Sequence, residues 1–232
     1  MIIKKIALTF LLILLSGFLI TGCNNGTTNL NQEKTLVCLG DSLTAGRGAT
    51  TPGVDDKTKS YPAFLQNKIS IPVINAGVSG NTTAQGLSRV KADVLSKNPQ
   101  IIIINLGAND LFQRVSVNTT RENLQNIIKR VNGGNRKIYL AKFYTDEVVR
   151  AMGNSLQITN DSILAALRNQ YDDMFNSIAS KNKVTLIEDI WAGVWGIHMS
   201  DFIHPDAAGY EIMANNYFNV LEPYLLENGL LK

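Results

Sequence analysis

Short apolar runs alternate with segments of helical periodicity along the chain after residue 34. The clearest run is Ile101 to Ile104, four successive β-branched residues that have no helical face and suit a strand buried on both sides. Strands that alternate with helices are typical of a parallel sheet covered by helices on both faces. The runs predict five strands: Thr35 to Leu39, Val73 to Asn75, Gln100 to Leu106, Lys137 to Lys142, and Val184 to Glu188.

The segments between these strands each carry one apolar face, as amphipathic helices do. The first, Thr83 to Lys97, has an apolar face made of Ala84, Leu87, Val90, Val94 and Leu95. In the second, Asn118 to Val131, the stretch from Thr119 to Glu122 matches a capping box. Two further helices are predicted over Ser155 to Lys181 and Ala207 to Leu226.

The connections are less regular. Arg47 to Ser60 contains glycine, proline and polar residues and is predicted to be a loop, whereas Phe143 to Asn154 has no clear pattern.

The elements together indicate the α/β class, as a three-layer α/β/α sandwich with a flavodoxin-like, five-stranded parallel sheet.

The N-terminus has the pattern of a targeting signal. Met1 to Gly22 begins with two lysines and continues as an apolar run that ends directly before Cys23. The run of about 15 residues is short for a bilayer span of ~20 residues, which favours a cleaved signal peptide over a transmembrane anchor. The residues before Cys23 resemble a bacterial lipobox. That resemblance implies an exported lipoprotein, held on a membrane by the lipid at Cys23 and facing the periplasm or the cell exterior.

Three regions follow from this pattern: a signal peptide over residues 1–22, the lipid-bearing cysteine with a flexible tether over 23–34, and one domain over 35–232. With Cys23 modified, Cys38 has no partner for a disulfide, and its apolar neighbours predict that it packs as a small hydrophobic residue.

Composition and charge exclude several classes of protein. Hydrophobic residues make up 45% of the chain and charged residues 18%, which is typical of a globular protein and excludes a disordered one. Removal of Lys4 and Lys5 with the signal would reduce the net charge from +3 to +1, and no basic stripe is present. Nucleic acid is therefore not an expected partner.

Polar, glycine-rich blocks follow the predicted strands, where α/β sheets bind their ligands. Gly40 to Gly46 follows the first strand, Asn75 to Thr82 the second, and Gly107 to Asp110 the third. Asp201 and His204 precede the last helix, at a spacing that lets a carboxylate hold one imidazole nitrogen while the other faces a nucleophile. Each block alone is also a common turn or helix-capping sequence, so only their combination is informative.

Together the four blocks resemble the SGNH hydrolases, also called the GDSL lipase and esterase family, from Thr35 to about Leu225. The resemblance implies that Ser42 is the nucleophile, His204 its general base and Asp201 the group that orients the histidine. It places the oxyanion hole at the backbone N–H groups of Ser42 and Gly80 and the side-chain amide of Asn109. It also implies no cofactor and no metal.

Within the family, the Leu39 to Leu43 and Ser79 to Thr82 blocks are most similar to the bacterial thioesterase, arylesterase and lysophospholipase group. The resemblance implies a serine esterase that hydrolyses acyl esters or thioesters through an acyl-enzyme. Arg47 to Ser60 and Phe143 to Leu167 look longer than in that group, which leaves the acyl preference open. One alternative is a carbohydrate O-deacetylase acting on envelope polysaccharide. A less favoured one is a lipoprotein that keeps the fold for binding alone.

Other chemistries have little support in the sequence. The two histidines, His198 and His204, fit no standard metal-ligand spacing, and no G-x-G-x-x-G or P-loop sequence is present. Trp191 and Trp195 lie close to Asp201, so they could stack on a sugar, border an acyl chain or belong to the core.

Overall fold

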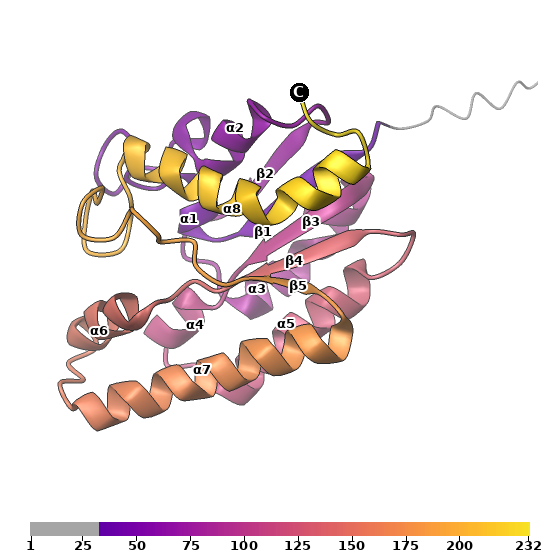
Figure 1. Cartoon of the computed structure of the whole chain (residues 1–232). Coiled ribbons are helices and arrows are strands. Elements are labelled where there is room, and N and C mark those ends of the chain that lie inside the picture. The colour runs from indigo at the N-terminus through magenta and orange to yellow at the C-terminus, as the bar shows by residue number, and fades with distance from the viewer. Residues whose placement is uncertain (1–32) are drawn as a thin grey trace, which may run out of the picture. The chain divides into compact units, whose positions relative to one another are not determined.

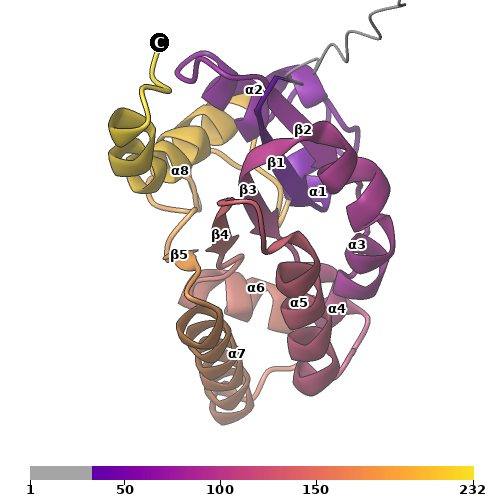
Figure 2. The same ribbon diagram turned by 90° about the vertical axis from the view of Figure 1, so that its right-hand side faces the viewer.

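The computed structural model describes residues 33–232. The predicted signal peptide, Cys23 and nearly all of the predicted tether lie outside the described residues. In the described part, five parallel strands form one sheet in the order β2-β1-β3-β4-β5. This is the flavodoxin-like order of an open α/β sheet, with helices on both faces (Figures 1 and 2). The predicted fold class is confirmed.

All five predicted strands are present, with ends within two residues of the expected positions. Ile101 to Ile104 are fully buried at the centre of the sheet, because β3 pairs with β1 on one side and β4 on the other. Cys38 on β1 is also fully buried, as a free thiol. The strands are β1 Thr35–Gly40, β2 Val73–Gly77, β3 Pro99–Asn105, β4 Lys137–Ala141 and β5 Thr185–Ile187.

Two layers of helices cover the sheet (Figure 2). One layer contains α2 (Tyr61–Gln66) and α8 (Ala207–Glu227), which are joined by stacked rings of Tyr61 and Tyr217 with centroids 4.2 Å apart. The other contains α3 (Thr83–Arg89), α5 (Val117–Val131) and α7 (Asp161–Asn182). None of the helices within residues 33–232 is both long and apolar enough to cross a membrane.

Short helices lie at the carboxyl end of the sheet, where they form part of the edge that carries the glycine-rich blocks. They are α1 (Ser42–Ala45), α4 (Ala108–Phe112) and α6 (Asp146–Ser155) (Figure 1). Arg47 to Ser60 is mainly a loop, as predicted, with one 3-10 turn at Lys57–Lys59.

The predicted continuous helix Thr83 to Lys97 is wrong. The α-helix ends at Arg89 and is followed by a π turn at Val90–Val94 and a 3-10 turn at Leu95–Lys97. Ala84, expected on the apolar face, is exposed. Thr83 is buried instead, because its backbone N–H and its hydroxyl both donate to the buried carboxylate of Asp110 in α4.

One predicted cap and one predicted helix start are also wrong. Helix α5 begins one residue early, because Ser116 caps it by accepting the Thr119 N–H at 3.1 Å; the expected capping box at Thr119 to Glu122 is not used. The predicted helix Ser155 to Lys181 begins only at Asp161, because Ser155 is the last residue of α6 and residues 156–160 are not helical. Gln157 has a φ of +61°, a left-handed conformation that ends α6, and Asn160 then caps α7. Most of α6 lies in the segment that showed no clear pattern.

Candidate active site

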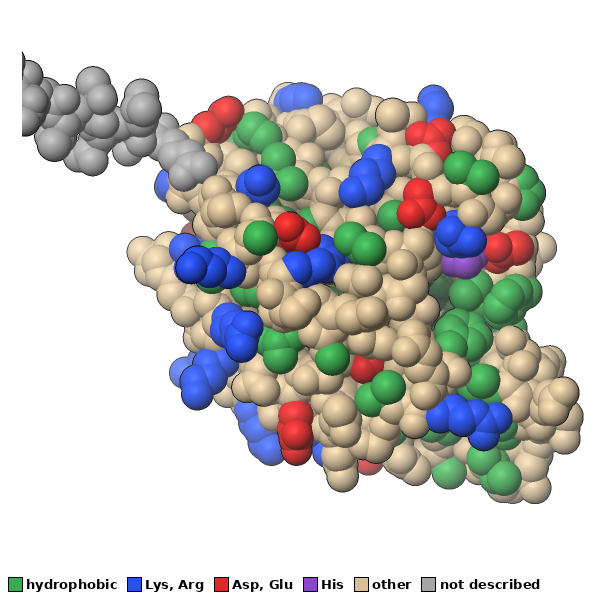
Figure 3. Space-filling model, turned by 180° about the vertical axis from the view of Figure 1, so that it is seen from behind, with side chains coloured by type: hydrophobic (Ala, Val, Ile, Leu, Met, Phe, Trp, Pro, Cys, Tyr) green, Lys and Arg blue, Asp and Glu red, His purple; other side chains and the backbone are tan. Residues whose placement is uncertain are grey.

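The turn after β1 places Ser42 at the carboxyl edge of the sheet. Asp41 caps α1 by accepting the Leu43 N–H at 3.1 Å, so the serine becomes the first residue of this short helix. Ser42 lines an open hollow of about 410 Å³ at this edge. In Figure 3 the hollow lies at the right-hand edge, where a histidine side chain borders a group of hydrophobic side chains.

Three side chains from opposite ends of the chain form one hydrogen-bonded series. The Ser42 Oγ lies 3.0 Å from Nε2 of His204, although 162 positions separate the two residues. The Nδ1 of His204 lies 2.7 Å from Oδ2 of Asp201 and 3.0 Å from its Oδ1. His204 is buried, so the imidazole is fixed between the hydroxyl and the carboxylate. This arrangement fits a base that is oriented by a carboxylate and contacts a nucleophile.

The local fold of residues 201–204 holds Asp201 in its ionised form. Partial burial raises the pKa of this carboxyl, but the backbone N–H groups of Ile203 and His204 and the imidazole of His204 donate to it. These bonds outweigh burial, and the pKa of Asp201 lies below its usual value. The carboxylate therefore stays charged and able to accept the imidazole N–H.

Gly80 and Asn109 line the same hollow as Ser42 and His204. Gly80 has a φ of +80°, and an added Cβ would meet nothing within 4 Å, so the backbone conformation is what favours glycine here. Among the described residues, no acceptor takes the Gly80 N–H. The Asn109 Nδ2 donates to the carbonyl oxygen of Asn81 at 3.1 Å and to Oδ2 of Asp41 at 3.3 Å. The structure thus brings together all five residues that the sequence predicted for the site.

Asp41 lies beneath the nucleophile and is almost completely buried. Burial raises its pKa from 3.8 to about 7, although the N–H of Leu43 and the charge of Arg89 act in the opposite direction. Burial therefore favours the protonated form of this carboxyl next to the nucleophile.

Sequence reasoning missed Arg89, which connects β1 and β2 to the loop beside Gly80. Its guanidinium donates to the carbonyl oxygen of Gly40 at the end of β1 and to that of Ala76 on β2, both at 2.7 Å. It also donates to Oδ1 of Asn81 at 2.8 Å, next to Gly80. No signal in the sequence marks this role, because the three acceptors come from separate segments that only the folded sheet brings together.

The remaining candidates lie at the margin of the site. Trp191 is buried, donates its indole N–H to the carbonyl oxygen of Phe143 at 2.9 Å and borders a small cavity beside Ser42. Trp195 packs edge-on against Trp191. The Nδ1 of His198 lies 3.7 Å from a carboxylate oxygen of Asp206, and the histidine does not line the hollow.

Comparison with known proteins agrees with this geometry. Residues 38–212 match the GDSL-like Lipase/Acylhydrolase family. Esterase TesA of Pseudomonas aeruginosa is 24% identical over 225 residues, which cover 90% of this chain and 99% of that protein. Thioesterase 1/protease 1/lysophospholipase L1 of Escherichia coli is 33% identical over 103 residues, which cover 44% of this chain and 47% of that protein.

Solved structures show the same fold. The crystal structure of TesA superposes with a TM-score of 0.66 at 23% identity, covering 82% of this chain and 99% of that one. AlinE4, described as an SGNH-hydrolase family esterase, gives 0.57 at 28% identity, covering 83% of this chain and 97% of that one. The chain belongs to the GDSL-like lipase and acylhydrolase family, the SGNH hydrolases, and is an esterase-type acylhydrolase.

Proposed function

We propose that the protein hydrolyses carboxylic esters or thioesters through a covalent acyl-enzyme on Ser42, with His204 as general base and Asp201 as its orienting carboxylate. The observation that carries the proposal is the continuous contact from the Ser42 Oγ through the imidazole to the Asp201 carboxylate. With Nδ1–H donating to Asp201, the Nε2 of His204 is left free to accept the serine proton.

The reaction has two halves. In the first, Ser42 Oγ bonds to the ester carbonyl carbon while its proton moves to Nε2 of His204. The tetrahedral intermediate then collapses, the bond to the alcohol or thiol breaks, and His204 gives its proton to the leaving group. In the second half, His204 takes a proton from water, the resulting hydroxide attacks the acyl-enzyme, and the acid is released as Ser42 regains its proton.

The oxyanion of each intermediate needs donors. The backbone N–H groups of Ser42 and Gly80 and the Asn109 amide are the groups we propose for this role. Both hydrogens of the Asn109 amide already have acceptors, Asn81 and Asp41. The longer bond, to Asp41 at 3.3 Å, is the one that the substrate oxygen would replace.

A carbohydrate O-deacetylase is the second candidate function. The hollow combines the rings of Phe112 and Phe202 with the polar side chains of Arg47 and Ser79. Ser79 donates to a carboxylate oxygen of Asp55 at 2.6 Å, and Arg47 contacts the same oxygen at 3.3 Å. Polar groups at the wall, beside aromatic rings, favour an alcohol that carries hydroxyl groups.

The test compares the full-length protein with Ser42→Ala on p-nitrophenyl esters from acetate to palmitate and on an acetylated polysaccharide. Loss of most of the rate in a folded Ser42→Ala supports the serine mechanism, and acetate release from the polysaccharide supports the deacetylase. Equal activity of the two proteins would exclude Ser42 as the nucleophile.

We also propose that the protein is an exported lipoprotein, anchored through Cys23. Support comes from the lipobox-like sequence and from 30% identity over 124 residues to the "Uncharacterized lipoprotein YqeF" of Bacillus subtilis, covering 50% of this chain and 48% of that protein. The amino end of β1 and the edge of the sheet that carries Ser42 are separated by the length of this six-residue strand, about 20 Å.

Labelling cells with a fatty acid tests the anchor. Cys23→Ser is expected to lose the label, whereas Cys38→Ser, which changes the other cysteine, is expected to keep it. Label that persists in Cys23→Ser would contradict the proposed lipidation.

A further inference from the structure

Two cavities meet at the nucleophile. The open hollow of about 410 Å³ is described above; the second, called the buried cavity below, holds about 20 Å³ and is lined mostly by buried side chains. The residues that line both are Ser42, Asn109, Phe112 and Ile203. His204 lines the open hollow and not the buried cavity.

This difference indicates which cavity would take the leaving group of an ester and which would take its acyl group. His204 must protonate the leaving oxygen, so the leaving group has to lie on the side that the imidazole faces, in the open hollow. The acyl substituent projects from the other side of the carbonyl carbon, and the buried cavity opens there beside Ser42 and Asn109. We propose that the buried cavity is the acyl subsite, that it admits an acetyl group and little more, and that Met152 and Val148 of α6 set this limit. The inference rests on the proposed function of Ser42.

The size of the cavity supports an acetyl limit. A site needs roughly 10–15 Å³ of such volume to hold one water molecule, so about 20 Å³ accommodates about one methyl group. The far wall consists of four buried side chains, Phe143, Val148, Met152 and Trp191. A longer acyl chain would have to displace this wall, and close-packed interiors resist such displacement.

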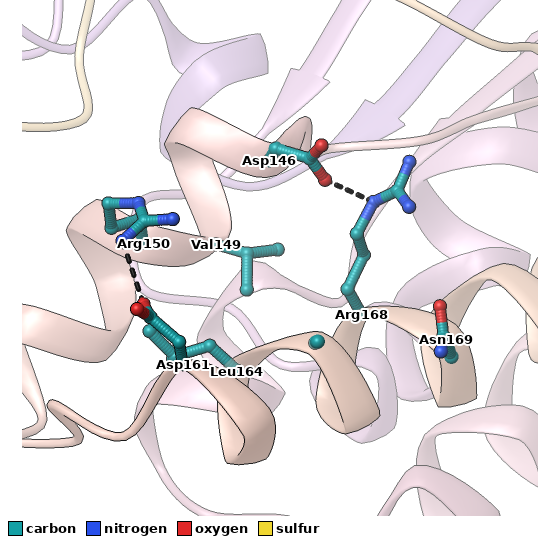
Figure 4. Close-up of a pocket in the computed structure, with 8 residues that line it drawn as sticks. Asp146, Val149, Arg150, Asp161, Leu164, Arg168 and Asn169 are labelled. Atoms are coloured by element: carbon teal, nitrogen blue, oxygen red, sulfur yellow. Dashed lines mark hydrogen bonds and ion pairs between the residues drawn. The ribbon is translucent and has the colours of Figure 1, made fainter.

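Contacts with α7 restrain helix α6, which forms part of this wall. Helix α6, which carries Val148 and Met152, is joined to α7 by two ion pairs (Figure 4). Arg150 of α6 pairs with Asp161 at 2.8 Å, and Asp146 pairs with Arg168. Gly153 approaches α7 so closely that an added Cβ would lie 2.3 Å from a methyl group of Leu164. Outward movement of α6 would disturb these contacts with α7, although a pocket of about 230 Å³ also lies between the two helices (Figure 4).

The rest of the wall is fixed as well. The indole N–H of Trp191 is bonded to the carbonyl oxygen of Phe143 at 2.9 Å, and the Phe143 ring packs edge-on against Tyr171 of α7. The cavity is thus a small, mainly apolar pocket that fits a short acyl chain. The open hollow leaves room for a much larger alcohol, so the substrate class is acetyl esters of bulky alcohols.

The experiment measures kcat/KM of the full-length protein on p-nitrophenyl acetate, butyrate and octanoate, which share one leaving group. Met152→Ala removes three heavy atoms from the wall. Met174→Ala is the matched control, because Met174 is fully buried in α7 and lines neither cavity. Ser42→Ala reports the background.

The wild type is expected to prefer acetate over butyrate by about 10-fold or more, since a hydrophobic pocket discriminates by 10–200-fold per group that does not fit. Met152→Ala is expected to raise the butyrate-to-acetate ratio by about 10-fold, while Met174→Ala keeps the wild-type ratio. If Met152→Ala does not fold, Val148→Ala provides the same test with a smaller change.

Three results would overturn the inference. A wild type that hydrolyses octanoate as well as acetate, in a Ser42-dependent manner, would refute the acetyl limit and leave the proposed function intact. An unchanged ratio in a folded Met152→Ala would remove α6 as the determinant. Absence of Ser42-dependent hydrolysis on every ester would instead refute the proposed function, and the inference with it.

Discussion

Replacing Asp41 with asparagine tests the electrostatics beneath the nucleophile. Burial is the main reason that the pKa of Asp41 is raised from 3.8 to about 7, and its hydrogen bond from Leu43 only partly offsets that effect. In the unfolded chain this carboxyl ionises near its ordinary value. Between about pH 4 and pH 7 the folded state therefore binds more protons than the unfolded state, and the free energy of unfolding falls as the pH rises.

The size of the effect follows from the shift. A difference of about 3 pKa units corresponds to roughly 4 kcal/mol of stability that is present below pH 4 and lost by pH 7. Asparagine cannot ionise, and its side-chain oxygen can still accept the Leu43 N–H. Relative to wild type, Asp41→Asn is therefore expected to become steadily more stable across this range, whatever its fixed cost at low pH.

Urea unfolding of the two full-length proteins from about pH 4.5 to 7.5 measures this difference. Asp56→Asn is the matched control, since Asp56 also caps a short helix but sits in the 47–60 loop. Hydrogen bonds from Thr58 lower the pKa of Asp56. The stability that this carboxylate contributes is therefore lost only as the pH falls below the ordinary pKa of an aspartate. The control difference should be flat. A flat difference for Asp41→Asn as well would refute the claim that burial keeps this carboxyl protonated.

Asn109→Ala removes one oxyanion donor and is expected to lower kcat by about 10²–10³-fold with little change in KM, as measured on p-nitrophenyl acetate; an undiminished kcat would exclude this role. A lysine at position 89 cannot reach all three acceptors, so Arg89→Lys is expected to lower kcat by about 10-fold with KM nearly constant. Asp93→Asn is the control, because it removes only the surface ion pair of the Arg89 guanidinium, at 3.0 Å, and it should behave as wild type. The rate should rise from acid toward neutral pH because His204 must be neutral to accept a proton, and a flat profile from about pH 4 to 8 in stable protein would contradict this.

Much of the fold could be predicted from the sequence because the strands are short, apolar and β-branched. Ile101 to Ile104 show this most clearly, since their burial on both faces requires an uninterrupted apolar run. The helices were predicted less well. The unused capping box at Thr119 to Glu122 and the late start of α7 both depend on capping and on single backbone angles, which periodicity does not record.

The candidate site was predictable for a different reason. Each of its blocks directly follows a strand or precedes the last helix, so the order of the parallel sheet brings them to one edge. What lay beyond sequence reasoning depends on tertiary contact alone. Arg89 donates to acceptors on β1, on β2 and in the loop at Asn81, and the pKa of Asp41 is set mainly by its burial. The cavity behind Ser42 likewise exists only because α6 packs against α7.

The most direct test of the central claim is to trap the covalent intermediate. The full-length protein is mixed with p-nitrophenyl acetate, quenched in acid within the first turnover, digested and analysed by mass spectrometry. An acetyl group is expected on the peptide that contains Ser42, and the His204→Ala protein should not acquire it at a comparable rate. An acetyl group that accumulates on another residue, with Ser42 unmodified while ester is being hydrolysed, would contradict the account.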